Sequence, residues 1–256
     1  MKLAIAGKGG SGKTTVAATV ARLAARRGVE VLAIDADFNP NLAFTLGVSQ
    51  DAFAKVTALP PDVVRRRGRG MEATLELARP VDELVHQFGF DCPDGVRLLL
   101  MGRPEKAGTG CLCLEHETVR SLLRELPPDQ RLVLLDMEAS PEHLSRATPE
   151  AADVMLVVAE PYFRSLETAR RQAALAEDLG IARVAVVANK IRTPDDSRAV
   201  ESFCEGHGIH VEATVPYDER LGEAERVGAA PIDHAADAPA VMAIAELVDG
   251  LLSPAR

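Results

Sequence analysis

The chain has 256 residues, of which 38 are acidic and 29 are basic, giving a formal net charge of −9. This length suits one α/β domain with a substantial core. The acidic balance excludes the broad basic footprint that nucleic-acid phosphates require, so we expect no nucleic-acid partner. No apolar run approaches the ~20 residues that span a bilayer. Because a predicted strand begins at residue 3, we also expect no signal peptide and no membrane partner, and therefore a cytoplasmic protein.

A glycine-rich loop follows the first predicted strand, 3–6, and precedes a helix-forming stretch that starts at Val16. The loop reads Gly7-Lys8-Gly9-Gly10-Ser11-Gly12-Lys13-Thr14-Thr15. A strand, a glycine loop and a helix in this order are the setting of a P-loop. Glycines let backbone N–H groups turn around phosphate oxygens, and the helix N-terminus adds partial positive charge. The loop from Gly9 to Thr15 therefore predicts binding of ATP or ADP, with catalytic Lys13 on the β- and γ-phosphates and the Thr14 hydroxyl on Mg²⁺.

Short apolar runs alternate with helical patterns along the whole chain. The predicted strands are 3–6, 31–34, 96–101, 132–135, 154–159, 184–188 and 209–215, and helical stretches include 14–27, 163–179, 195–205 and 240–252. The nearly continuous Val, Leu and Ile content indicates strands that are buried on both faces. We therefore predict an α/β fold with a doubly wound, mostly parallel sheet flanked by helices, and Gly28 and Gly180 as helix C-caps.

The region 49–95 breaks this rhythm. It has no clear strand and contains Pro60-Pro61 and the run Arg65-Arg66-Arg67-Gly68-Arg69. We interpret it as an irregular insertion packed beside the P-loop core, within a single domain that spans 1–256. The arginine run is interpreted as a solvated loop, with a partner contact as the alternative.

Carboxylates stand at the ends of two predicted strands. Asp35 and Asp37 follow the strand 31–34, and Asp136 follows the strand 132–135. Carboxylates that face a P-loop from strand ends can hold Mg²⁺ or orient water for attack on the γ-phosphate. We predict that Asp136 shares Mg²⁺ with Thr14. For Asp35 and Asp37 the alternative is that they merely cap the strand end.

Asn189-Lys190 closes the strand 184–188, and Pro216-Tyr217-Asp218 follows the strand 209–215. The Asn189 amide offers a donor and an acceptor that can pair with the edge of adenine. These residues are therefore candidates for the nucleotide pocket, and ordinary loop chemistry is the alternative.

Cys111 and Cys113 lie two residues apart in a glycine-bearing turn, so both thiolates could face one metal ion. Zn²⁺ and square-planar Ni²⁺ each take four ligands, and a two-fold dimer would supply the second pair. The alternative is two small buried thiols. His116 is a further candidate ligand, although a lone histidine is more often an ordinary surface residue. Cys92 and Cys204 are isolated and are interpreted as packed thiols.

The pattern K-G-G-x-G-K-T-T resembles the deviant Walker A family of dimeric ATPases, which includes the ParA/MinD-type positioning ATPases and the nitrogenase iron protein. The resemblance implies that Lys8 is catalytic and reaches the partner subunit's nucleotide in an ATP-bound homodimer. It also implies that Asp37 positions the attacking water, and that Asn189, Lys190, Pro216 and Asp218 line the adenine pocket. Phe38 departs from the family pattern, which usually has proline there.

The segment G-C-x-C-x-E-x-x-x-x-R-x-L-L and the run that starts at Glu160-Pro161 resemble the CooC-type accessory ATPases of carbon monoxide dehydrogenase maturation. The resemblance covers essentially the whole chain. It implies that Cys111 and Cys113 bind Ni²⁺ or Zn²⁺ at the dimer interface, and that ATP hydrolysis drives nickel insertion into a client enzyme, carbon monoxide dehydrogenase.

Two other functions stay open at this point. A ParA/MinD-type positioning ATPase would bind nucleic acid or membrane, which the acidic balance and the stretch 240–252, devoid of Lys and Arg, disfavour. An electron donor like the nitrogenase iron protein would ligate [4Fe–4S] with two cysteines per subunit, but the close spacing favours a single ion.

Overall fold

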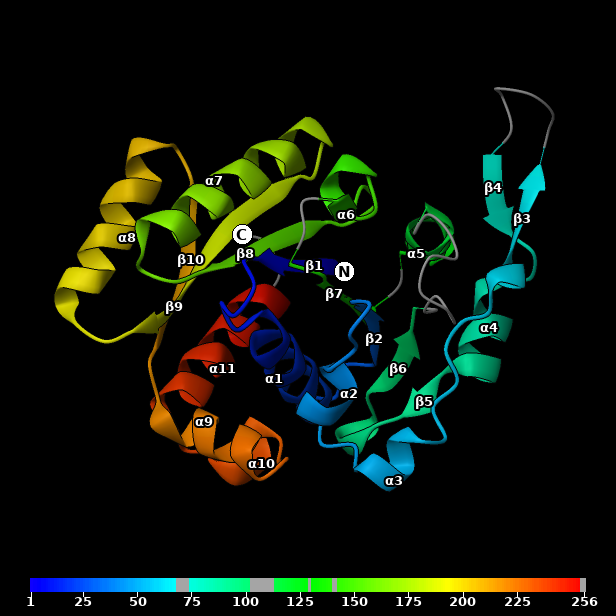
Figure 1. Ribbon diagram of the computed structural model, residues 1–256, viewed down its shortest axis with the longest axis horizontal. Helices are drawn as coiled ribbons and strands as arrows, with labels where there is room; N and C mark the ends of the chain where they lie inside the picture. The colour runs from blue at the N-terminus through cyan, green and yellow to red at the C-terminus, as the bar shows by residue number, and fades with distance from the viewer. Residues whose placement is uncertain (68–73, 102–112, 129, 140–141, 254–256) are drawn as a thin grey trace.

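A computed structural model describes residues 1–67, 74–101, 113–128, 130–139 and 142–253. Its centre is a sheet in the strand order β10-β9-β8-β1-β7-β2-β6-β5, with helices on both faces (Figure 1). The strands are β1 Lys2–Gly7, β2 Val31–Ala36, β5 Phe90–Asp91, β6 Arg97–Leu100, β7 Leu132–Met137, β8 Val154–Ala159, β9 Arg183–Ile191 and β10 His210–Pro216. The seven longer strands pair in parallel, and the short β5 lies antiparallel on β6. The predicted doubly wound sheet is therefore confirmed.

The described α-helices include the four predicted stretches, 14–27, 163–179, 195–205 and 240–252. They are α1 Lys13–Arg26, α2 Leu42–Thr45, α3 Gln50–Phe53, α4 Val81–Phe88, α5 Cys113–Glu125, α6 Glu142–Ser145, α7 Phe163–Asp178, α8 Pro194–Gly206, α9 Glu219–Arg226, α10 Pro231–His234 and α11 Pro239–Leu252. Gly28 and Gly180 adopt φ of +81° and +79° just after α1 and α7, as C-cap glycines do. Within the described ranges, no helix has the length and apolar content needed to cross a membrane.

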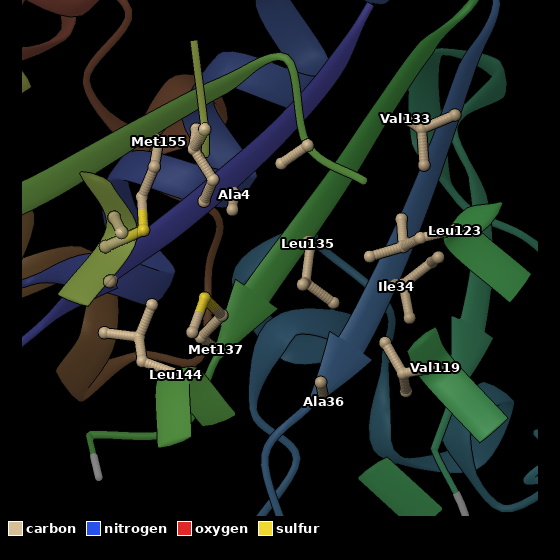
Figure 2. Packing of buried hydrophobic residues seen from close by; sticks show 14 of the residues in the cluster. Ala4, Ile34, Ala36, Val119, Leu123, Val133, Leu135, Met137, Leu144 and Met155 are labelled. Carbon is tan, nitrogen blue, oxygen red and sulfur yellow. The ribbon is translucent and has the colours of Figure 1, made fainter. Parts of the chain in front are cut away.

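Each strand divides its side chains between two cores, because successive residues point to opposite faces. Leu3, Ile5 and Leu134 belong to the core beneath α1 and α11. Ala4, Ile34 and Leu135 belong to the opposite core. Figure 2 shows this second core, where Val119 and Leu123 of α5 face Ile34 and Ala36 of β2, and Leu144 of α6 lies beside Met137. The sheet is thus buried on both sides, as the apolar strands predict.

The prediction that 49–95 has no strand is wrong. A hairpin of β3 Val64–Arg67 and β4 Thr74–Leu77 crosses this region, and β5 also lies within it. The hairpin is short, and three consecutive arginines in β3 hide its alternation. Arg65, Arg66 and Arg67 are exposed strand residues rather than a loop, and Arg67 pairs with Glu76 at 3.1 Å. One end of the hairpin packs on the core, because the paired residues Val64 and Leu77 are buried.

Candidate nucleotide site

The P-loop connects β1 to α1 at the carboxyl edge of the sheet. Gly7, Gly10 and Gly12 all have positive φ, at +144°, +80° and +96°. A Cβ on Gly7 would lie 2.3 Å from the Val158 carbonyl oxygen, and one on Gly12 would lie 2.4 Å from the Asn189 side-chain nitrogen. The loop is therefore built for glycine in both conformation and space. Helix α1 starts at Lys13 without a side-chain cap, which leaves its first-turn N–H groups open to phosphate.

Lys13 sits at the base of this loop. Its side chain is buried, with Nζ 3.4 Å from the carbonyl oxygen of Lys8. Burial lowers the pKa of Lys13, and the nearby carboxylates of Asp136, Asp37 and Glu138 oppose that shift. Lys8, in contrast, is exposed on the rim of the loop. The two lysines of the motif thus occupy different environments, one turned into the chain and the other available to a ligand or a partner.

Asp35 and Asp136 are paired across β2 and β7, on the face covered by α1. Both are buried. Burial and, next, the charge of the nearby Asp35 raise the pKa of Asp136 to about 8, while a hydrogen bond from Thr14 and the charge of Lys13 oppose the rise. Its Oδ1 has no hydrogen-bond partner within the part of the chain that the structure describes. A buried carboxylate oxygen without a partner, beside a hydroxyl, fits Mg²⁺, which prefers hard oxygen ligands.

The loop after β2 is held by its own carboxylates. Asp35 accepts hydrogen bonds from the backbone N–H of Asp37 at 3.1 Å and of Leu42 at 3.0 Å. Asp37 accepts one from the backbone N–H of Asn39 at 2.8 Å, and its side chain is half-buried. Asp35 therefore does more than cap the strand, because it fixes the loop that presents Asp37 toward Lys13.

A cavity of about 440 Å³ opens beside the P-loop. Its walls come from the loop, α2 and the α9–α10 region. The lining residues are Gly10, Gly12, Lys13, Thr14, Thr15, Asn41, Phe44, Thr45, Lys190, Leu221, Glu225, Gly228, Ala229 and Pro231. The contribution of 221–231 was missed by the sequence analysis. A Gly-Ala-Ala-Pro turn carries no recognisable nucleotide signal, and only its position after the last strand could have suggested it.

Asn189 and Lys190 both bind the P-loop. Asn189 is buried and donates from Nδ2 to the Ser11 carbonyl oxygen at 2.7 Å. Lys190 donates from Nζ to the Gly10 carbonyl oxygen at 2.5 Å and pairs with Glu160 at 3.0 Å. Lys190 also has a φ of +59°, a strained conformation for a residue with a side chain. These contacts brace the loop from β9, and the adenine contact of Asn189 remains a prediction.

Pro216 ends β10, and Asp218 begins the next turn. The Asp218 carboxylate caps α9, accepting from the backbone N–H of Arg220 at 3.0 Å, and it pairs with the Arg220 side chain at 3.1 Å. This ion pair lowers the pKa of Asp218. Asp218 therefore orients α9, whose Leu221 and Glu225 line the cavity. A direct contact of Pro216 or Asp218 with the base remains a prediction.

The cysteine prediction falls largely outside the described residues. Cys111 is not among them, and Cys113 is placed only as the first residue of α5. Cys92 and Cys204 are buried, free thiols, as predicted, and burial raises the pKa of Cys92 to about 12. The interpretation of His116 as a surface residue is wrong, because its side chain is only 1% exposed. The helical period of α5 places His116 on the face that packs against the sheet.

His116 meets a second buried histidine, His143 of α6. Their ring centroids are 4.3 Å apart and the rings are nearly perpendicular. Burial and, next, the neighbouring His116 lower the pKa of His143 to about 3, while the Ala36 backbone opposes the shift. His143 is therefore neutral at physiological pH.

Comparison with known proteins places this site in a family. Residues 2–232 match the model of the CobQ/CobB/MinD/ParA nucleotide binding domain. The chain is 39% identical to the carbon monoxide dehydrogenase accessory protein CooC of Rhodospirillum rubrum, covering 89% of this chain and 88% of that protein. The chain belongs to the CooC-type ATPases of the ParA/MinD family. It is also 38% identical to an ATP-binding protein of Methanocaldococcus jannaschii, over 89% of this chain and 90% of that protein.

Solved structures bear out the fold of this ATPase. The MinD cell division protein of Aquifex aeolicus superposes with a TM-score of 0.71 at 21% identity, covering 100% of this chain and 98% of that one. MinD of Pyrococcus horikoshii, solved with Mg-ADP, superposes with a TM-score of 0.72 at 18% identity over the full length of both chains. At these identities the likeness concerns the fold, and it confirms the P-loop ATPase architecture.

Gly12→Ala should weaken Mg-ADP binding by roughly tenfold or more, because a left-handed φ costs an L-residue about 1–2 kcal/mol and the Cβ would strike Asn189. Isothermal titration calorimetry measures the affinity. Gly28→Ala is the matched control, with φ +81° and open space around its Cβ, far from the loop. It should lose stability but keep its affinity. Equal affinities for Mg-ADP in the two variants would contradict the conclusion that the P-loop requires glycine at position 12.

His143 should make the fold sensitive to acid. The unfolded chain binds a proton at this residue below about pH 6.5, whereas the folded chain does so only near pH 3, so folding stability falls as the pH drops between these values. At pH 5 the loss is about 2 kcal/mol. Urea unfolding at pH 7 and pH 5 should show that His143→Phe loses less stability than wild type by this amount. The other titratable groups, including Asp136, are present in both chains, so their contributions to the pH dependence of stability cancel in the comparison. Parallel pH dependences of the two chains would refute the lowered pKa of His143.

Proposed function

We propose that this ATPase is a metallochaperone that couples ATP-dependent dimerisation to the insertion of Ni²⁺ into a nickel enzyme, carbon monoxide dehydrogenase. The observation that carries the proposal is the sequence pair Cys111 and Cys113, of which Cys113 is the first residue of α5, a helix packed on the strand that carries Asp35. The 39% identity with an accessory protein of carbon monoxide dehydrogenase supports the choice of client. We place the protein in the cytoplasm as one domain, with no nucleic-acid or membrane partner.

Two cysteines supply half of a four-coordinate site for Ni²⁺ or Zn²⁺. A two-fold homodimer brings the same pair from each subunit to one axis and completes the set. In this proposal Lys8, exposed on the rim of the P-loop, reaches the nucleotide of the partner subunit. Nucleotide binding and metal binding are then completed by the same association.

The hydrolytic step uses groups that the fold already brings together. Lys13 and the first-turn N–H groups of α1 hold the phosphates, and Asp37 orients the attacking water. Asp136 and Thr14 would hold Mg²⁺, which supplies charge neutralisation on the β- and γ-phosphates. Loss of the γ-phosphate then weakens the closed dimer and releases the metal to the client.

Cys111→Ser and Cys113→Ser should each abolish Ni²⁺ binding to the ATP-bound dimer, because a serine hydroxyl is a poor ligand for this ion. Equilibrium dialysis with metal analysis measures the bound ion, with one Ni²⁺ expected per wild-type dimer. Cys92→Ser and Cys204→Ser are the matched controls and should bind like wild type. Equal binding by all four variants would refute the metal site. A brown, iron-containing dimer, or co-sedimentation with DNA or liposomes in ATP, would favour the alternative functions.

Lys8→Ala should still bind nucleotide but lose ATP-dependent dimerisation, because Lys13 and the glycine cradle remain while the contact across the interface is removed. Analytical ultracentrifugation with a non-hydrolysable ATP analogue measures the mass. Lys55→Ala, a substitution of an exposed lysine after α3, serves as the control and should dimerise. Full dimerisation of Lys8→Ala would contradict the proposed role of this lysine.

A further inference from the structure

Three aromatic rings from three separate segments meet in the core behind the nucleotide site. Phe38 lies edge-on to His116, with ring centroids 5.8 Å apart and an angle of 79°. His116 lies edge-on to His143, at 4.3 Å and 81°. We call Phe38, His116 and His143 the ring stack. Edge-to-face packing of this kind holds rings in a defined relative orientation.

Both histidines of the ring stack are buried in the core. His116 is 1% exposed and His143 is 0% exposed. Neither nitrogen of His143 makes a hydrogen bond of good geometry within the described segments. A buried imidazole costs free energy where its polar contacts are weak, and the interaction of His143 with the Ala36 backbone only partly offsets this cost. The hydrolytic site described above makes no direct use of either histidine.

Each ring belongs to a segment with a role in the nucleotide site or the cysteine motif. Phe38 directly follows Asp37. His143 lies in α6, a few residues after the strand that presents Asp136. His116 is one helical turn beyond Cys113, the first residue of α5. The stack is therefore a physical contact between the two segments that would respond to the γ-phosphate and the helix that begins at the cysteine motif.

Other contacts tie α5 to the chain around α6. Arg120 pairs with Glu150 at 2.7 Å, and Arg124 also pairs with Glu150. His116 Nδ1 lies 3.4 Å from the Thr148 hydroxyl oxygen. Figure 2 shows Val119 of α5 beside Ala36, the last residue of β2. Helix α5 thus has little freedom to move without moving the ends of β2 and β7.

We propose that the ring stack positions Asp37 for hydrolysis and transmits to it the position of the helix that carries Cys113. This assigns a purpose to Phe38, which stands where the family motif usually has proline, since its ring contacts His116. The transmission rests on the proposed function. Because coupling between two binding sites is reciprocal, metal on the cysteines and nucleotide in the P-loop must alter each other's affinity by the same factor.

Steady-state ATP hydrolysis without added Ni²⁺ tests the positioning role. Phe38→Leu and His116→Leu should lower kcat by tenfold or more while KM for ATP stays within twofold, because the phosphate cradle is untouched. His116→Phe restores an aromatic edge and should recover most of kcat. Phe203→Leu is the matched control, since Phe203 stacks on His207 at 4.4 Å in α8, remote from the P-loop. A wild-type kcat in Phe38→Leu, or a fall that follows the melting temperature and appears equally in Phe203→Leu, would overturn the positioning role.

Titration of the same proteins with Ni²⁺ tests the transmission. In wild type, Ni²⁺ should change kcat, and the ATP analogue should change Ni²⁺ affinity. In Phe38→Leu the effect of Ni²⁺ on kcat should be lost, although the ATP analogue still forms the dimer that binds Ni²⁺. An unchanged effect of Ni²⁺ on the kcat of Phe38→Leu would overturn the transmission. A wild-type protein that binds no Ni²⁺ would overturn the proposed function and the transmission together, while the positioning of Asp37 would stand or fall on kcat measured without metal.

Discussion

The lateral pairing of Asp35 with Asp136 is the interaction on which the nucleotide site depends. The parallel register of β2 and β7 sets the two carboxylates side by side on the same buried face, beneath the start of α1. Burial, and with it the repulsion between these like charges, raises the pKa of Asp136. The charge of Lys13 compensates part of this negative charge. Both carboxylate oxygens of Asp35 accept hydrogen bonds from the backbone of the next loop. The Oδ1 atom of Asp136 is left without a hydrogen-bond partner among the described residues, which fits the Mg²⁺ site that we propose.

The two faces of the sheet divide the work of the molecule. The face under α1 holds the P-loop, the paired carboxylates and the cavity, whereas the opposite face holds α5 and the ring stack. Ala36, the last residue of β2, belongs to the core that contains α5. The next residue, Asp37, lies near Lys13 of the nucleotide site. A single peptide unit therefore joins the core that contains α5 to the nucleotide site.

The sequence predicts the parts of this structure that are local. Consecutive residues form the P-loop glycine motif, the apolar strands and the acidic strand ends. The sheet and the P-loop could therefore be predicted from the sequence. The β3–β4 hairpin could not, because three exposed arginines hide its alternation. The α9–α10 wall of the cavity could not either, because its residues form no recognisable nucleotide-binding motif. His116 was misjudged for another reason: its burial arises from contacts with Phe38 and His143, which only the tertiary fold creates.

The position of β1 between β7 and β8 has a consequence for how the chain is made. Lys2 pairs with Val133, and Leu3 pairs with Val154, so the first strand has no neighbour until more than half of the chain exists. At ~5–20 residues per second, synthesis of the intervening residues takes roughly 7 to 26 s. During this time the P-loop follows a strand that has not yet paired with its neighbours in the sheet. A nascent chain therefore acquires its affinity for nucleotide late, once β8 has left the ribosome.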